Sequence, residues 1–94
     1  MAAAGKSVRV PLGRTPATPG AMELTTAAER NIAFTRHSHG DWGDVCREDW
    51  QTNDQALRDG ERLLSIYHTL NGTKFYIITE ADRSATTILL PSEY

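Results

Sequence analysis

The sequence predicts an α+β fold, in which two or three helices precede a three-stranded antiparallel β-meander packed on the main amphipathic helix. Residues 63–90 contain three short apolar runs, rich in β-branched and aromatic residues and separated by turn-forming residues. Residues 45–59 repeat apolar side chains at helical spacing. A chain of 94 residues has room for one small hydrophobic core.

One domain is expected over residues 19–94, after a flexible basic tail over residues 1–18 that mixes Ala, Gly and Pro without periodicity. Lys6, Arg9 and Arg14 give this end of the chain a charge of +3. Residues 21–94 contain 7 basic and 12 acidic side chains and so carry a net charge of −5. An acidic body disfavours strong direct binding of nucleic acid and favours a host protein or complex with a basic, nucleic-acid-binding surface.

Capping residues predict two helices near the N-terminus. Thr18-Pro19-Gly20 places an N-cap hydroxyl before a proline at the first helical position. Thr26-Ala27-Ala28-Glu29 fits a capping box, which starts a helix reaching about His37.

The main helix is predicted from Val45 to Asp59, with Asp44 as its N-cap and Gly60 at its C-terminal end. We expect its apolar face to cover one side of the meander. That face consists of Cys46, Trp50, Asn53, Ala56 and Leu57.

The register of the meander is predicted from Asn71-Gly72, a pair typical of the two-residue type I′ hairpin. This turn places Tyr67 opposite Tyr76, and a second turn places Thr79 opposite Thr86. The register divides the apolar side chains into a core face, formed by Leu64, Ile66, Phe75, Ile77, Ile88 and Leu90, and a second face, formed by Tyr67, Tyr76, Ile78 and Leu89.

The second face is the predicted contact surface for a protein partner, because tyrosine is enriched at interfaces. The alternative is that the N-terminal helices cover this face. Trp42 lies in a glycine-flanked loop, where it either anchors a partner or fills the end of the core. Asp82 and Arg83 add a charged contact at the second turn. The candidate partner-binding residues are therefore Tyr67, Tyr76, Ile78, Leu89, Trp42, Asp82 and Arg83.

A metal site is the alternative suggested by His37, His39 and Asp41, whose HxHxD spacing matches the start of a metallo-hydrolase motif. The motif is incomplete, because Trp42 stands where a third histidine is needed. Ser65 has no neighbouring His-Asp arrangement in the sequence that would make it a nucleophile. We therefore expect no cofactor, no metal and no catalytic residue.

Cys46 is the single cysteine, so neither an intramolecular disulfide nor a CxxC zinc knuckle is expected. A chain without disulfides suits the reducing cytoplasm. No apolar run approaches the roughly 20 residues that a membrane span requires. We expect a cytoplasmic protein that does not enter a membrane.

Several segments of the chain resemble a family of small bacterial proteins carried on plasmids and integrative elements, usually labelled plasmid-related or hypothetical. The resemblance covers about Thr18 to Tyr94 and departs from the family at residues 23–34, where the family often has a longer pair of helices. It implies no catalytic residue. It implies an accessory protein of a mobile element, and such proteins often bind host factors, including restriction and CRISPR machinery. The segments that carry it are residues 40–44, 60–65, 77–84 and 86–94.

These observations lead us to expect a non-enzymatic protein-binding accessory protein of a mobile genetic element, in the form of an anti-restriction or anti-CRISPR inhibitor. An acidic protein can occupy a basic nucleic-acid channel. One alternative is a small metal-dependent hydrolase or nuclease that uses the loop of residues 37–41. The other is a homodimer with a structural or regulatory role, formed through the tyrosine face or an edge strand.

Overall fold

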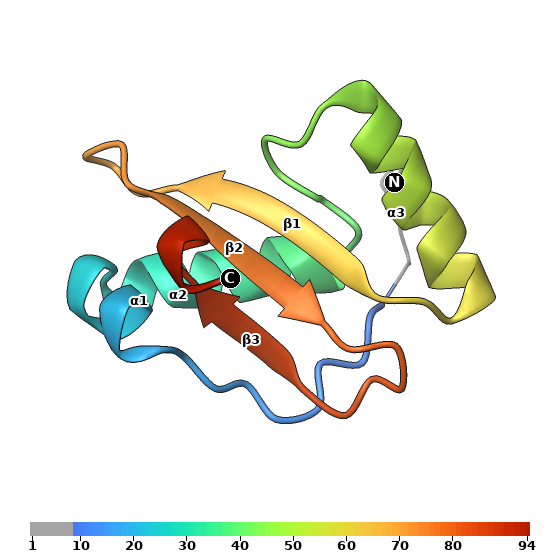
Figure 1. Cartoon of the computed structure of the whole chain (residues 1–94), viewed down its shortest axis with the longest axis horizontal. Helices are drawn as coiled ribbons and strands as arrows, with labels where there is room; N and C mark the ends of the chain where they lie inside the picture. The colour runs from blue at the N-terminus through green and yellow to red at the C-terminus, as the bar shows by residue number, and fades with distance from the viewer. Residues whose placement is uncertain (1–8) are drawn as a thin grey trace, which may run out of the picture.

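The computed structural model describes residues 9–94 and has three α-helices followed by a three-stranded antiparallel sheet (Figure 1). The predicted α+β class is therefore confirmed, and the strands follow one another in the order β1-β2-β3. The elements are α1 (Pro19–Leu24), α2 (Ala27–Ser38), α3 (Arg47–Asp59), β1 (Leu63–His68), β2 (Lys74–Thr79), β3 (Thr86–Leu89) and a short 3-10 helix, η2 (Pro91–Glu93).

The predicted caps start the first two helices. The Thr18 hydroxyl accepts from the Ala21 amide (3.2 Å) at the start of α1. At the start of α2, the Glu29 amide donates to the Thr26 hydroxyl (3.1 Å), while the Thr26 amide donates to the Glu29 carboxylate (2.9 Å). These reciprocal bonds form the predicted capping box.

Helix α3 begins two residues later than predicted. Its N-cap is Cys46, and the carboxylate of the predicted cap, Asp44, lies instead 2.7 Å from the His68 ring on β1. Its C-terminal end is the predicted one: Gly60 adopts the left-handed conformation, with φ of 72°.

The register of β1 against β2 is one residue away from the prediction, because Tyr67 lies opposite Phe75 and Ile66 lies opposite Tyr76. Side chains alternate along a strand, so a one-residue shift moves every side chain of β1 to the other face of the sheet. The prediction that Tyr67 and Tyr76 share a face is therefore wrong. The predicted register of β2 against β3 is confirmed, with Thr79 opposite Thr86.

A longer hairpin loop causes this shift. The Thr69 amide donates to the Thr73 carbonyl (2.9 Å), and the Gly72 amide donates to the Thr69 carbonyl (3.0 Å). Gly72 has a φ of 90°. Among the described residues, Arg83 is the only non-glycine residue with a positive φ. Asn71 therefore lies outside the left-handed region that a type I′ turn needs. The loop is a three-residue connection with glycine at its left-handed position.

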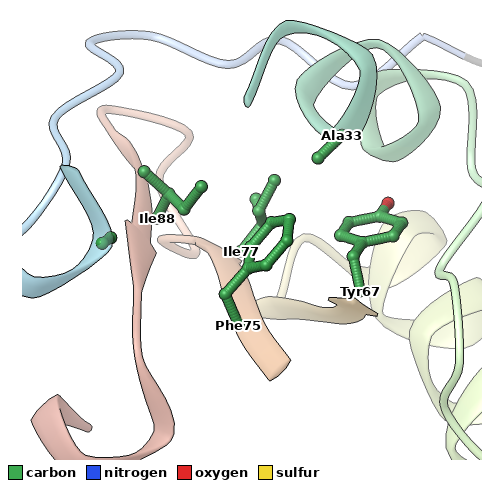
Figure 2. Close-up of a cluster of buried hydrophobic side chains, with 6 residues drawn as sticks. Ala33, Tyr67, Phe75, Ile77 and Ile88 are labelled. Atoms are coloured by element: carbon green, nitrogen blue, oxygen red, sulfur yellow. The ribbon is translucent and has the colours of Figure 1, made fainter. Parts of the chain in front are cut away.

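The core face of the sheet packs against α2 and α1 rather than against α3 (Figures 1 and 2). Figure 2 shows the side chains of Tyr67 and Phe75 on the side of the sheet where α2 carries Ala33. Each large side chain buried here contributes about 1.5–3 kcal/mol to stability. The buried members of this cluster are Ala21, Ala33, Tyr67, Phe75, Ile77 and Ile88.

Helix α3 lies beside β1 and packs on a second cluster (Figure 1). The expectation that α3 covers the face with Phe75 and Ile77 is therefore wrong. Its contact with β1 includes the polar member of its apolar face, Asn53, whose amide group donates to the Leu64 carbonyl (2.7 Å) and accepts from the Leu64 amide (3.1 Å). The buried members of the second cluster are Val10, Trp42, Ala56 and Leu63.

The outer edge of β1 is covered by these bonds and by the loop before α3. The Ile66 amide donates to the Trp42 carbonyl (3.1 Å), and the Asp44 amide donates to the Ile66 carbonyl (2.7 Å). Together with the Asn53 bonds to Leu64, they occupy the outward backbone groups of Leu64 and Ile66, which an added strand would use.

The outer edge of β3 is covered by the segment before α1, which runs parallel to it (Figure 1). The Thr86 amide donates to the Arg14 carbonyl (2.7 Å), and the Ile88 amide donates to the Pro16 carbonyl (3.1 Å). This part of the predicted flexible tail thus packs on the domain, while residues 1–8 of that tail lie outside the described residues. Both sheet edges are capped, which disfavours dimerisation through an edge strand.

Candidate functional site

Tyr67, a predicted partner-binding residue, is part of the core. Its side chain is 2% exposed, and its hydroxyl donates to the Asp41 carbonyl (2.5 Å). The Arg36 guanidinium lies 4.8 Å from the centre of its ring, at the distance of a cation–π contact. Burial raises the pKa of the Tyr67 phenol. This side chain is therefore part of the core and is not the exposed contact that was predicted.

The face that carries Tyr76 is also largely covered. Tyr76 is half-buried and meets the ring of Tyr94 edge to face, with 5.8 Å between ring centres. Ile78 and Leu89 are buried. The C-terminal turn η2 lies against β2 (Figure 1), so this face does not form the open apolar surface that the predicted register implied.

Trp42 fills the end of the core, which is one of its two predicted roles. Its side chain is 0% exposed and belongs to the cluster that includes Ala56 and Leu63. The indole N–H donates to the Asp54 carboxylate (2.9 Å), so its polar group is also satisfied.

Arg83 stabilises the second turn through its own hydrogen bonds. Its φ is 63°, and its guanidinium donates to the carbonyls of Glu61 (2.7 Å), Glu80 (3.2 Å) and Ala56 (3.4 Å). These bonds tie the turn to the C-terminal end of α3. Asp82 is exposed, and hydrogen bonds from Ser84, which lower the pKa of its carboxyl, hold it in the turn.

The proposed metal ligands His37, His39 and Asp41 do not converge. His39 Nδ1 donates to the Thr35 carbonyl (2.7 Å), and the Asp41 carboxylate accepts two bonds from Arg36 (2.8 and 3.2 Å). Within residues 9–94, no group of three or more His, Cys, Asp or Glu side chains lies close enough to hold a metal ion. The loop is held together by Arg36 instead.

His37, on the buried side of α2, belongs to a polar hydrogen-bond network. Its Nδ1 is 2.6 Å from the Ser65 hydroxyl and its Nε2 is 2.8 Å from the Thr79 hydroxyl, which is 2.7 Å from the hydroxyl of Thr86. Burial, with a smaller effect from the charge of Arg83, lowers the pKa of His37 from 6.5 to about 4. The imidazole is therefore neutral at pH 7.

The contact between Ser65 and His37 was missed from the sequence, because 28 positions separate the two residues. Both side chains are fully buried, and the second nitrogen of His37 meets the hydroxyl of Thr79 rather than a carboxylate. The arrangement therefore lacks both substrate access and the acidic member of a catalytic triad.

An open surface lies elsewhere, in a groove of about 330 Å³ between α2 and the β1–β2 hairpin. Four polar side chains also line it: Thr26, Glu29, Arg36 and His68. Its apolar lining residues are Ala28, Ile32, Ala33, Tyr67, Leu70 and Phe75.

Two large aliphatic side chains are exposed at this groove: Ile32 is 60% exposed and Leu70 is 100% exposed. The Leu70 amide donates to the carboxylate of Glu29 (3.1 Å), which fixes the hairpin loop beside α2. The backbone bonds from Thr26 and Leu70 lower the pKa of the Glu29 carboxyl, and the hydrogen bond to Asp41 raises the pKa of Arg36. Both side chains are thus charged at neutral pH.

Sequence reasoning missed the groove because the sequence alone does not show which side of α2 faces the sheet. One signal was present. Ile32 and Phe34 are two positions apart, so they lie on opposite sides of a helix and cannot both face one core. The structure directs Phe34 toward the first core cluster and leaves Ile32 exposed.

Comparisons with protein-family models, with curated protein sequences and with solved structures found no match for this chain. Among residues 9–94, no helix has both the length and the apolar character needed to cross a membrane.

Proposed function

We propose that this chain is a protein-binding module that contacts its partner through the groove between α2 and the β1–β2 hairpin. The observation that carries the proposal is the exposure of Ile32 and Leu70 beside an apolar groove. Transferring one such side chain from water into an interface contributes about 1.5–3 kcal/mol. Exposed apolar side chains grouped on a monomer surface are typical of contact sites.

The state of the reactive side chains supports binding rather than catalysis. His37 is buried and bonded at both ring nitrogens, and Asp41 is paired with Arg36. The groove itself presents an apolar surface lined by a few charged groups, which is the composition of a protein interface.

The predicted role as an inhibitor carried by a mobile element indicates which partners to test first, namely host defence complexes. The charge of −5 over residues 21–94 supports a partner with a basic surface. The contact surface we propose for that role differs from the predicted tyrosine face, because Tyr67 is buried.

Replacing Ile32 with Asp is expected to reduce recovery of the bound partner at least tenfold, because a charge would enter the apolar contact. A tenfold loss corresponds to about 1.4 kcal/mol, which is within the contribution of one buried isoleucine. The measurement is affinity capture of the tagged full chain from cells that also make an untagged copy, with quantitative mass spectrometry of the recovered proteins.

The matched control is Thr52→Asp, at an exposed position of α3. Both substitutions are on helix surfaces, so each should change the free energy of unfolding by only about 0.5 kcal/mol. A partner recovered equally with wild type, Thr52→Asp and Ile32→Asp would contradict the proposed surface.

A further inference from the structure

We propose that the groove binds a second copy of this chain, through antiparallel pairing of α2 with α2 of the partner copy. This inference depends on the proposed function, because it uses the same surface. It names the occupant of that surface from the arrangement of charge along α2.

Helix α2 carries opposite charges at equal distances from its exposed apolar centre. Glu29 and Arg36 both line the groove and are seven positions apart, about 10 Å along the helix. The midpoint between them falls between Ile32 and Ala33. A two-fold axis through that midpoint places Glu29 of each copy opposite Arg36 of the other, as a closed dimer requires.

Both charged groups can take a partner from another molecule. The carboxylate of Glu29 accepts bonds from the backbone amides of Thr26 and Leu70, both uncharged donors. Arg36 donates to Asp41 through Nε and Nη2, which leaves its other terminal nitrogen, Nη1, for an acceptor on the second copy. Glu29 and Arg36 can therefore pair across the axis without losing these contacts.

The exposed surface of α2 suits close approach of two helices. Ile32 is 60% exposed, Ala28 is exposed and small, and the exposed Asn31 and Thr35 are uncharged. Helices pack 8–10 Å apart when small and aliphatic side chains meet. Antiparallel pairing also places the acidic N-terminal turn of one α2 beside the basic C-terminal turn of the other, which the helix dipoles favour.

Other surfaces of the described chain are less suited to self-association. The edge of β1 is bonded by Asn53 and the loop before α3, and the edge of β3 is bonded by the Arg14 and Pro16 carbonyls. Tyr76 is covered in part by Tyr94. We therefore place the contact of the predicted homodimer on α2 rather than on the sheet.

The test is sedimentation equilibrium of the full chain with charge-reversed variants. Glu29→Lys and Arg36→Glu each place like charges opposite one another, and each is expected to raise the dimer dissociation constant at least tenfold. The double variant restores opposite charges and should dimerise more tightly than either single variant. An equal mixture of the two single variants pairs a basic surface with an acidic one, so it should sediment near twice the 10.4 kDa mass of the chain.

Two further variants separate binding from folding. Glu29→Gln retains the capping box and removes only the charge, so it should weaken the dimer less than Glu29→Lys. Ile32→Asp leaves the caps and Arg36 intact and should abolish the dimer. Circular dichroism at each concentration verifies that the variants are folded.

The second-copy inference would be overturned if the wild-type chain stayed monomeric at about 1 mM. The free energy of association would then be weaker than about 4 kcal/mol. A mixture that dimerises no better than its separate components would also overturn it. If the chain is monomeric while Ile32→Asp still loses a captured protein, the groove binds a different partner and the proposed function stands. If Ile32→Asp also leaves the amount of captured protein unchanged, both proposals fail.

Discussion

Replacing Gly43 with Ala is expected to lower the free energy of unfolding by about 4 kcal/mol, which is exceptional for one methyl group. An added Cβ would lie 2.0 Å from the Ile66 carbonyl oxygen and 2.7 Å from the Tyr67 ring. The backbone there has a φ of 77°, which side chains other than glycine rarely adopt. Because the obstructing oxygen belongs to β1 itself, the strand or the loop must move. Urea denaturation followed by circular dichroism measures the change.

Gly60→Ala is the matched control for this prediction. Gly60 has a similar φ of 72°, but no atom lies within 4 Å of an added Cβ. Only the conformational cost remains, about 1 kcal/mol. Equal losses for the two variants would contradict the close approach of the loop containing Gly43 to β1.

The free energy of unfolding is expected to fall by about 3 kcal/mol between pH 7 and pH 4 through His37 alone. Burial holds the pKa of His37 at about 4 in the folded chain, below its ordinary value of 6.5. The unfolded chain therefore takes up this proton first as the pH falls. The contribution of His37 to stability is full above pH 6.5 and is lost as the pH falls to 4. Urea denaturation at several pH values between pH 7 and pH 4 measures this change.

His37→Leu should remove this slope and also lower stability at pH 7 by about 2 kcal/mol, because the Ser65 hydroxyl loses a buried partner. His68→Gln replaces an exposed histidine outside the network of His37 and serves as the surface control. The carboxyl pKa values of Glu29 and Asp41 are lowered in the folded chain, so their contributions begin to be lost at the acid end of this range; the difference between wild type and His37→Leu isolates the part due to His37. An imidazole of His37 that titrates near pH 6.5 by NMR would contradict the buried network.

The sequence predicted the features of the fold that depend on neighbouring residues. The Thr26–Glu29 capping box and the C-terminal Gly60 of α3 arise within one turn of helix. The β2–β3 register follows from the turn at residues 81–84 and the pairing of Thr79 with Thr86, and both were predicted correctly.

The β1–β2 register was not predictable from the hairpin residues, because Asn71-Gly72 suits both a two-residue and a three-residue loop. The choice depends on distant partners. His37 of α2 provides the hydrogen bond that makes an inward Ser65 favourable, and Asp41 provides the acceptor for an inward Tyr67. Hydrophobic alternation alone favours an inward Ile66, so the pattern pointed to the wrong face.

The candidate site was missed for the same reason. The predicted tyrosine face depended on the register and disappeared when Tyr67 moved into the core. Conversely, the groove exists because Leu70 is held beside α2 by Glu29, a contact between positions 41 residues apart. Ile32 is exposed because α2 is oriented with Ala33, Phe34 and His37 toward the core.

Photo-crosslinking from position 32 tests the proposed binding surface most directly. A photoreactive aliphatic residue in place of Ile32 retains its apolar character, and the same residue in place of Thr52 on α3 serves as the control. Irradiation of cells that express the full chain should give one discrete crosslinked species from position 32 and none from position 52. A species of twice the 10.4 kDa chain mass is the result predicted for the paired α2 helices. If position 32 gives no product above that of position 52, the groove is not a contact surface and the account is wrong.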